Sequence, residues 1–486
     1  MINITIAWIA LPFFVGFLIY LLPKLSRFLA LGVALLSANY ALAIFVDPSF
    51  VLDIKLLDSF GVTLTIDQVS GFFIITNALV TAAVILYCWN SEKTAFFYMQ
   101  ATILHGSVNA TFICADFISL YVALEVISIA SFLLISYPRT DRSIWVGLRY
   151  LFVSNTAMLF YLVGAVLVYQ AHHSFNFVGL RGVPPEVVAL IFLGLLAKGG
   201  IFVSGLWLPL THSESQSPVS AMLSGAVVKA GVFPLVRCAL MLEEIDPIVR
   251  FFGVSTALLG VGFAVFEKDT KRMLAFHTIS QLGFVLAAPV VGGFYALTHG
   301  LVKSALFLIA GVLPSRNFKE LQHHPIDNCI WVALAIASFS ISGFPLLSGF
   351  GAKVLTSKNL LPWQVIAMNI AAVGTAISFA KFIFLPHQKN ESEIKVNFGF
   401  WWAMVLLLGG LIVANAVYYE AYTIKNIIKP LVTIAIGWLA YLYIFKKLAI
   451  KLPREMEKFD HLIGFMSLML ILLFWIAWTQ LPIDNG

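Results

Sequence analysis

Apolar stretches of about 20 residues recur along the whole chain and are separated by short polar gaps. Most of the stretches are long enough to cross a hydrocarbon core of about 30 Å as a helix. The gaps are too short to hold a separate globular domain. The pattern therefore predicts an all-α polytopic membrane protein with about 14–16 transmembrane helices. The expected spans are 4–22, 28–46, 66–88, 95–115, 117–137, 144–169, 187–209, 218–240, 248–266, 273–291, 293–313, 328–357, 363–385, 399–419, 430–447 and 461–480.

The composition narrows the class of protein further. Of the 486 residues, 60% are hydrophobic and 11% are charged, and the mean hydropathy is +0.94. These values exclude a water-soluble enzyme. The formal net charge is +6, but the basic residues lie between the apolar stretches and not along one solvated face, so we expect no nucleic-acid partner.

The basic residues predict the orientation of the chain, because cytoplasmic loops carry an excess of lysine and arginine. The loops after odd-numbered spans, up to the eleventh, contain more of them than the other loops, and a basic loop at 446–458 falls on the same side. We therefore expect a multi-pass protein of the cell inner membrane whose N-terminus lies on the non-cytoplasmic side. The basic residues in question are Lys24, Arg27, Lys93, Arg139, Arg142, Lys268, Lys271, Arg272, Arg316 and Lys319.

Several ionisable residues lie inside apolar spans, where a charge is costly unless it is paired or hydrated. The acid, Glu125, lies roughly 12 Å into its span. A carboxylate and an amine at such depth can change charge with a passing proton, which favours a proton relay. Two alternatives remain open: the lysines reach the nearest interface, or Glu125 forms a structural ion pair. The basic residues of this group are Lys198, Lys229, Lys303, Lys353 and Lys381.

His299 and Lys303 are four residues apart and hence lie on one face of a helix. An imidazole and an amine in this arrangement can pass a proton along a chain of water molecules. The alternative is a histidine that only packs within the helix bundle.

Two spans contain residues that interrupt a helix, one in each half of the chain. Interrupted spans at corresponding positions are typical of transporters built from inverted repeats, with sites near the middle of the membrane. Ordinary glycine packing between helices is the alternative. The interrupting residues are Gly199, Gly200 and Pro209 around Lys198, and Gly343, Pro345, Gly349 and Gly351 before Lys353.

The sequence contains no motif for a cofactor or a metal. The cysteines occur singly in apolar surroundings, without a CxxC pair, and no GxGxxG or Walker loop is present. We therefore expect no cofactor, no metal site and no disulfide framework. The cysteines are Cys88, Cys114, Cys238 and Cys329.

Four motifs, located between about residue 95 and about residue 385, resemble a known superfamily. The most specific is WLPLTHSESQSPVSAMLSGAVVKAG at Trp207 to Gly231, and the others are DTKRMLAFHTISQLGF, THGLVKSALFLIAG and GFPLLSGFGAK. The sequence resembles the antiporter-like membrane subunits shared by respiratory complex I and the Mrp-type multisubunit cation/proton antiporters.

This resemblance implies two inverted five-helix repeats, each with a broken helix, and two half-channels joined by a central hydrophilic axis. The corresponding segments would be 1–94 for N-terminal transmembrane helices, 95–240 and 248–385 for the two repeats, and 399–486 for C-terminal transmembrane helices. The resemblance also implies a proton relay, called the candidate relay below, of Glu125, Lys198, Lys229, His299, Lys303 and Lys353.

The chain departs from the family pattern at five positions. Arg149 stands where the family often has a lysine, and an arginine cannot readily release its proton. The family commonly has proline or polar residues around the interrupted span that contains Lys198 and before Leu282, and this chain has other residues there. The usual water path near Lys198 is therefore in doubt. These replacements are Val203, Gly205, Leu210 and Gln281.

Within the superfamily, the lysine at position 353 resembles both the Mrp D-type and the complex I N-type subunits, whereas the M-type usually has glutamate there. The segments VKAGVFPLVR and HGLVKSALFLIAG are more similar to the Mrp D-type subunit. The chain would then move H⁺ in a complex with other membrane subunits, coupled to Na⁺ or another cation, without catalytic chemistry of its own. One alternative is an N- or M-type proton-pumping subunit of an NADH-quinone oxidoreductase. A second is a structural docking subunit that has lost transport.

Overall fold

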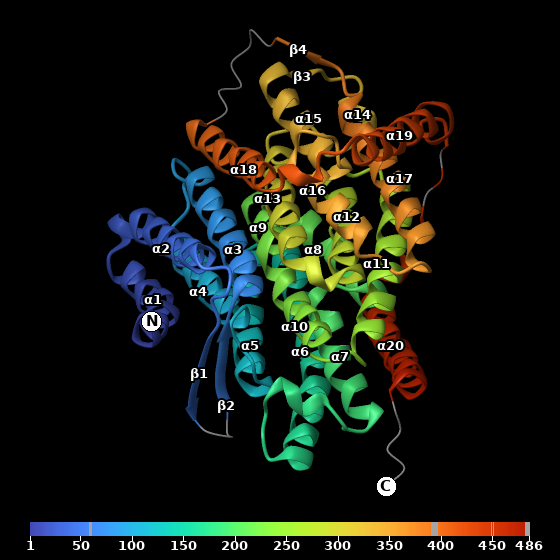
Figure 1. Ribbon diagram of the computed structural model, residues 1–486. Helices are drawn as coiled ribbons and strands as arrows, with labels where there is room; N and C mark the ends of the chain where they lie inside the picture. The colour runs from blue at the N-terminus through green and yellow to red at the C-terminus, as the bar shows by residue number, and fades with distance from the viewer. Residues whose placement is uncertain (58–60, 390–396, 449, 451, 482–486) are drawn as a thin grey trace.

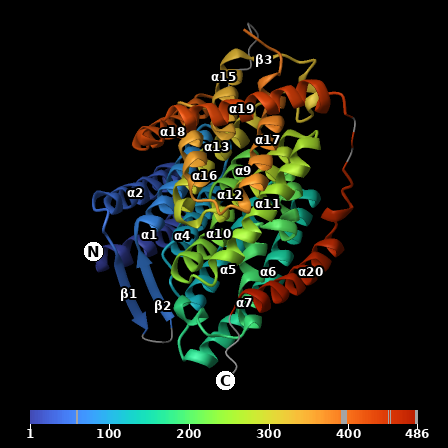
Figure 2. The same cartoon turned by 45° about the vertical axis from the view of Figure 1, so that its right-hand side comes forward.

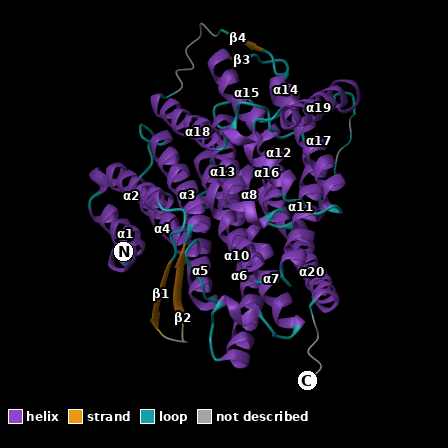
Figure 3. Ribbon diagram, viewed as in Figure 1, coloured by secondary structure: helices purple, strands orange, loops and turns teal. Residues whose placement is uncertain are grey.

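The structure is a computed structural model that describes residues 1–57, 61–389, 397–448, 450 and 452–481. Most of the described chain is helical, with two small strand pairs (Figures 1 and 3). Within it, 13 helical stretches are long and apolar enough to cross a membrane. Helices form there because lipid offers no hydrogen-bond partner to the backbone. The prediction of an all-α polytopic membrane protein is confirmed.

The N-terminal helices enclose a buried polar network. The imidazole of His105 on α4 contacts the hydroxyl of Ser37 on α2 at 2.8 Å and that of Thr81 on α3 at 3.1 Å. Both ring nitrogens therefore have partners, which agrees with a structural role for this histidine. The elements of this region are α1 (Ile2–Leu21), η1 (Pro23–Leu25), α2 (Ser26–Val46), β1 (Leu52–Leu57), β2 (Gly61–Ile66), α3 (Gln68–Tyr87) and α4 (Ala95–Thr111).

An antiparallel hairpin, β1–β2, connects α2 to α3 and extends from one end of the molecule (Figure 1). Leu52 pairs with Ile66, and Leu57 pairs with Gly61. The sequence prediction did not include this hairpin. Its residues alternate between apolar and polar types over only a few positions, and this short signal lies between two much stronger apolar spans.

The middle of the chain forms long helices that are interrupted near Lys198 and again before Lys229. The helix containing Lys198 ends at Gly199, and a 3₁₀ segment follows it. The elements are α5 (Phe117–Ile135), α6 (Asp141–His172), η3 (Phe177–Leu180), α7 (Pro185–Gly199), η4 (Phe202–Trp207), α8 (Leu208–Glu214), α9 (Ser217–Met222), η5 (Leu223–Val227) and α10 (Val228–Met241).

The next part of the chain has its own break, between α15 and α16. Its elements are α11 (Asp246–Phe266), α12 (Thr270–Ala287), η6 (Pro289–Val291), α13 (Gly292–Ala310), α14 (Phe318–Leu321), β3 (Ile326–Asp327), α15 (Asn328–Ser342), α16 (Ser348–Lys358), α17 (Gln364–Ile383) and β4 (His387–Gln388). The break after α7 and the break between α15 and α16 lie at the positions that the glycines and prolines predicted.

The last helices contact both parts of the chain. Helix α19 packs against α17, and α20 packs along α7 and η4 on the side of the molecule (Figure 2). The chain therefore passes from a helix beside α17 to a helix beside the first broken helix. The elements are α18 (Phe398–Val417), η7 (Tyr419–Ala421), α19 (Ile424–Ala440), η8 (Tyr441–Phe445), η9 (Glu455–Glu457) and α20 (Phe459–Gln480).

An ion pair joins the beginning of α3 to the end of α10. The guanidinium of Arg237 contacts both carboxylate oxygens of Asp67 and donates to the hydroxyl of Ser70 at 2.9 Å. Burial alone would raise the pKa of Asp67, but Arg237 and the backbone N–H of Ser70 together hold the pKa below its usual value. The carboxylate is therefore ionised in the pair. The pair holds the beginning of α3 against the end of α10.

Candidate functional site

Lys198 lies in the last turn of α7 and is almost completely buried, with 4% of the residue exposed. Its ammonium donates hydrogen bonds to the hydroxyls of Ser128 on α5 and Ser154 on α6, the latter at 2.7 Å. The two hydroxyls are 3.1 Å apart. A charged amine at this depth is therefore held by two neutral hydroxyl groups that come from neighbouring helices.

Glu125 lies on the same face of α5 as Ser128, one turn earlier. Its Oε1 atom is buried and has no hydrogen-bond partner. No ion pair between Glu125 and Lys198 occurs among the described residues. A buried oxygen without a partner is the expected place for an ordered water.

The break in α7 exposes backbone groups beside Lys198. Gly200 ends the helix in a left-handed conformation, with φ of 69°, and the indole of Trp207 donates to the carbonyl of Ala197 at 3.0 Å. The remaining carbonyls at the end of the helix carry partial negative charge, which favours an ammonium group at this position. The WLP motif thus supplies the indole that stabilises the break.

Lys229 is fully buried on α10, directly after a π-helical turn. The π-turn η5 leaves carbonyl groups free, and the Lys229 ammonium donates to those of Ser224 at 3.1 Å and Gly225 at 2.6 Å. π-turns inside helices are frequent at functional sites because they release such groups. The sequence predicted the lysine but not the turn that binds it.

Helix α13 passes close to Lys229 and contains the next two candidates. A Cβ atom on Gly300 would be 3.5 Å from Cε of Lys229, so the two helices touch at this glycine. Lys303 is fully buried and donates to the carbonyl of Leu274 on α12 at 2.5 Å. His299 makes no hydrogen bond through either ring nitrogen. The predicted pair His299 and Lys303 therefore shares a helix but is not joined by a hydrogen bond.

A small cavity lies between His299 and Lys353. Its volume is about 10 Å³, and its lining includes both residues together with Gln281 and Tyr295. A cavity of this size holds about one water molecule when polar groups line it. The structure thus brings His299 and Lys353 to the lining of one space that can hold a water molecule.

Lys353 lies on α16 against the end of α15. Its ammonium donates to the carbonyl of Ser342 at 3.1 Å, in the last turn of the preceding helix. Gly343 ends α15 with φ of 85°, and a Cβ atom there would be 2.8 Å from Cδ of Lys353. The lysines of both breaks therefore lie beside the carboxyl end of a half-helix, where a positive charge is favoured.

Two further buried histidines lie close to Lys303. Neither ring nitrogen of His212 or His277 has a hydrogen-bond partner, and each ring packs on a phenylalanine, Phe307 for the first and Phe379 for the second. The sequence analysis did not select His212, although this residue lies within the WLP to PVSA motif. Its place within the most specific motif of the chain was the signal that could have identified it.

Arg149 and Lys381 have roles different from the relay lysines. The Arg149 guanidinium donates to the backbone carbonyl of Glu457, whose carboxylate is paired with Arg272. Lys381 donates to the carbonyls of Ala264 and Glu267 at the end of α11. Lys381 thus binds carbonyl groups at the end of α11, and Glu457 is a contact that was not predicted from the sequence.

Residues 114–378 match the family described as NADH:quinone oxidoreductase/Mrp antiporter, transmembrane. The chain belongs to this family. Among curated relatives, it is 28% identical over 447 residues to the D subunit of a Na⁺/H⁺ antiporter of Alkalihalophilus pseudofirmus, covering 82% of this chain and 90% of the relative. It is 26% identical over 426 residues to an NAD(P)H-quinone oxidoreductase chain 4 of Microcystis aeruginosa, covering 76% of each.

A solved structure has the same fold. A chain in the Mrp complex from Dietzia superimposes with a TM-score of 0.73, covering 94% of this chain and 99% of that chain at 19% sequence identity. The family described as NADH:quinone oxidoreductase/Mrp antiporter therefore accounts for the resemblance in the four motifs. Both broken helices and all six residues of the candidate relay fall within the matched range.

Proposed function

We propose that this chain is the proton-translocating subunit of a multisubunit Mrp-type cation/proton antiporter. The observation that carries the proposal is the series of buried amines and imidazoles inside this fold, which continues from the first broken helix to the second. The similarity to the D subunit of a Na⁺/H⁺ antiporter along most of both chains supports the choice within the family.

In this mechanism, a proton that reaches Glu125 changes the net charge beside Lys198. Water has to connect the two residues, because no ion pair joins them among the described residues and Oε1 of Glu125 is left without a partner. Lys229 responds to this change, since its charge is held by only two carbonyl groups. The later steps pass along α13 to the water-sized cavity.

His299 and Lys303 pass the change in protonation from Lys229 toward Lys353. The unpartnered nitrogens of His299 are free to accept and donate through a water molecule in the small cavity. Lys353 then exchanges a proton with the far side. Each lysine can release its proton because neutral oxygens, and not a carboxylate, receive its hydrogen bonds.

The proposal includes an arrangement in the membrane. The segments 95–240 and 248–385 are the two inverted repeats, flanked by helices from 1–94 and 399–486. The chain lies in the cell inner membrane with its N-terminus on the non-cytoplasmic side. Its partners are other membrane subunits, and it transports H⁺ in exchange for Na⁺ or another cation.

Replacement of Glu125 tests the mechanism in the assembled complex. Glu125→Ala should abolish cation-dependent proton transport in inverted membrane vesicles, while Glu125→Asp should keep part of it. Assembly of the complex is measured in parallel by co-purification. Wild-type transport in a fully assembled Glu125→Ala complex would defeat the proposal.

A second candidate is an N- or M-type subunit of an NADH-quinone oxidoreductase, and the similarity to chain 4 of such an enzyme favours it. Mass spectrometry of the proteins that co-purify with an affinity-tagged chain distinguishes the two. Small membrane subunits without redox proteins support the antiporter, whereas subunits carrying redox cofactors support the oxidoreductase. A third candidate, a docking subunit without transport, would be favoured if Lys229→Ala left both assembly and transport intact.

A further inference from the structure

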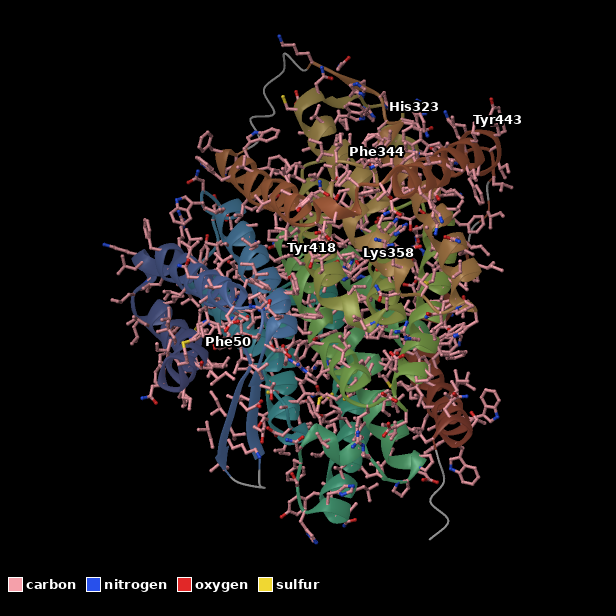
Figure 4. All side chains as sticks on the ribbon, viewed as in Figure 1. Phe50, His323, Phe344, Lys358, Tyr418 and Tyr443 are labelled. Atoms are coloured by element: carbon pink, nitrogen blue, oxygen red, sulfur yellow. The ribbon has the colours of Figure 1, made fainter. Side chains whose placement is uncertain are left out.

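A cavity of about 450 Å³ opens between α16, α17 and α19. Lys353 lines it and is partly buried, whereas Lys358, Lys425 and Lys429 line it and are exposed. Figure 4 labels Lys358, the last residue of α16. The cavity, called the lysine vestibule below, therefore leads from the last residue of the candidate relay to the surface.

The charged residues that line the lysine vestibule are all basic. Its lining contains four lysines and no aspartate or glutamate. None of the four takes part in an ion pair among the described residues. Lys429 donates only to the hydroxyl of Ser357, at 2.8 Å. Four ammonium groups around one cavity repel one another unless an anion enters.

Neutral polar groups complete the lining. The hydroxyl of Thr356 is buried, with 2% of the residue exposed, and has no hydrogen-bond partner. Thr423, Asn426 and Asn369 line the same space. Hydroxyl, amide and ammonium groups together form the set of donors that binds phosphate oxygens.

Helix α19 provides one wall of the lysine vestibule. Lys425, Lys429 and Thr433 follow one another at intervals of four residues and line the vestibule from one face of the helix. The adjoining positions on the helix are apolar and exposed, as in Ile424 at 79% and Ile428 at 54%. Lys425 and Lys429 lie in the first two turns of a helix that is long and apolar enough to cross a membrane. Basic residues at such a helix end are typical of the level of lipid headgroups.

We infer that the lysine vestibule binds a phosphate-bearing anion, the headgroup of an anionic phospholipid or free inorganic phosphate. The cavity volume of about 450 Å³ is large enough for a phosphate-bearing headgroup. The bound negative charge lies beside Lys353 and stabilises its protonated form, a consequence that rests on the proposed function. The binding itself does not depend on that function.

Native mass spectrometry of the assembled complex tests the inference. The complex is stripped of lipid in detergent and then supplied with phosphatidylglycerol, with phosphatidylcholine, or with phosphatidylglycerol in the presence of millimolar inorganic phosphate. The wild type should retain at least one more phosphatidylglycerol than the variant Lys425→Gln/Lys429→Gln. The charge-preserving variant Lys425→Arg/Lys429→Arg should retain it, which separates loss of charge from loss of folding.

The matched control is Lys24→Gln/Lys55→Gln, which removes two exposed lysines that do not line the vestibule. This control should bind lipid like the wild type. Displacement of the lipid by phosphate supports a free-anion source, and retention supports the headgroup. Equal phosphatidylglycerol binding by wild type and the glutamine variant, or no preference over phosphatidylcholine, overturns the inference.

Discussion

The carboxylate of Glu457 forms an ion pair with Arg272 of α12, while its backbone carbonyl accepts a hydrogen bond from Arg149 of α6. Arg272 also contacts Glu267 at 3.1 Å. The connection before α20 is thereby fixed to one helix from each of the two proposed repeats. This contact gives the C-terminal helices a role in holding the two parts of the chain together.

Loss of the Glu457 carboxylate should destabilise the protein. Its side chain is 10% exposed and that of Arg272 is 5% exposed, so removal of the acid leaves a buried charge with one partner fewer. Glu457→Ala should cost about 3 kcal/mol, since removing one partner of a buried pair is strongly destabilising. The Tm of the purified complex measures the effect.

Glu455 supplies the control for this experiment. It pairs with Lys458, and both side chains are largely exposed, at 62% and 61%. Exposed pairs contribute little. Glu455→Ala should leave the Tm unchanged, and an equal decrease in both variants would show that the connection tolerates no substitution and that the ion pair is not the cause.

The hydroxyls around Lys198 should be needed for transport. Hydrogen bonds to charged groups contribute about 1.5–3 kcal/mol, so removal of both should change the balance of protonation at Lys198 and slow transport by about tenfold or more. The variant Ser128→Ala/Ser154→Ala is assayed in vesicles at matched amounts of assembled complex. Ser107→Ala on α4 removes a hydroxyl that bonds only within its own helix and should transport normally.

Gly343 should be irreplaceable at the second break. A larger residue meets two obstacles, the positive φ of 85° and the close approach of Lys353. Left-handed backbone costs an ordinary residue about 1–2 kcal/mol, and the clash displaces the lysine in addition. Gly343→Ala should reduce transport severely. Gly464→Ala, where a Cβ atom meets no other atom within 4 Å, should have no effect.

The sequence predicted the helices, the two breaks and the buried charges because each depends on a local signal. Length and hydropathy determine a membrane span, and the glycines at 200 and 343 permit the left-handed turns that end the half-helices. The face of each helix that packs inside the protein could not be predicted from the sequence. Lipid and protein interior are equally apolar, so buried Leu124 and exposed Val122 look alike in the sequence.

Contacts between residues that are far apart in the chain could not be predicted from the sequence either. Glu457 lies in a basic loop, where it adds only to the charge count, and its pairing with Arg272 requires α20 to dock against α7. The hydroxyls of Ser128 and Ser154 look like ordinary small residues of helix interfaces. Their function as hydrogen-bond partners of Lys198 follows only from the packing of α5, α6 and α7.

The pair of Asp67 and Arg237 should stabilise the protein in a pH-dependent manner. The pKa of Asp67 is below its usual value of 3.8, so the folded state binds the proton more weakly than the unfolded state. The stabilisation is complete above about pH 4 and is lost as the pH falls through the lower, folded-state pKa. Asp67→Asn should lower the Tm at pH 7, and the difference from wild type should shrink below pH 4. A difference that does not change with pH would contradict the ionised pair.

His299 should act through the water in the small cavity and not through its size. The ring has no hydrogen-bond partner in the protein, and the cavity of about 10 Å³ separates it from Lys353. His299→Leu removes every polar atom of this side chain and should abolish proton transport, since the neighbouring Gln281 and Tyr295 can bind a water molecule but cannot pass a proton as an imidazole does. His299→Gln keeps a donor and an acceptor that can hold the water but cannot carry the proton as readily, so it should retain a small fraction of activity. If the leucine variant transported as well as the glutamine variant in equally assembled complexes, the path from α13 to Lys353 would have to bypass this histidine.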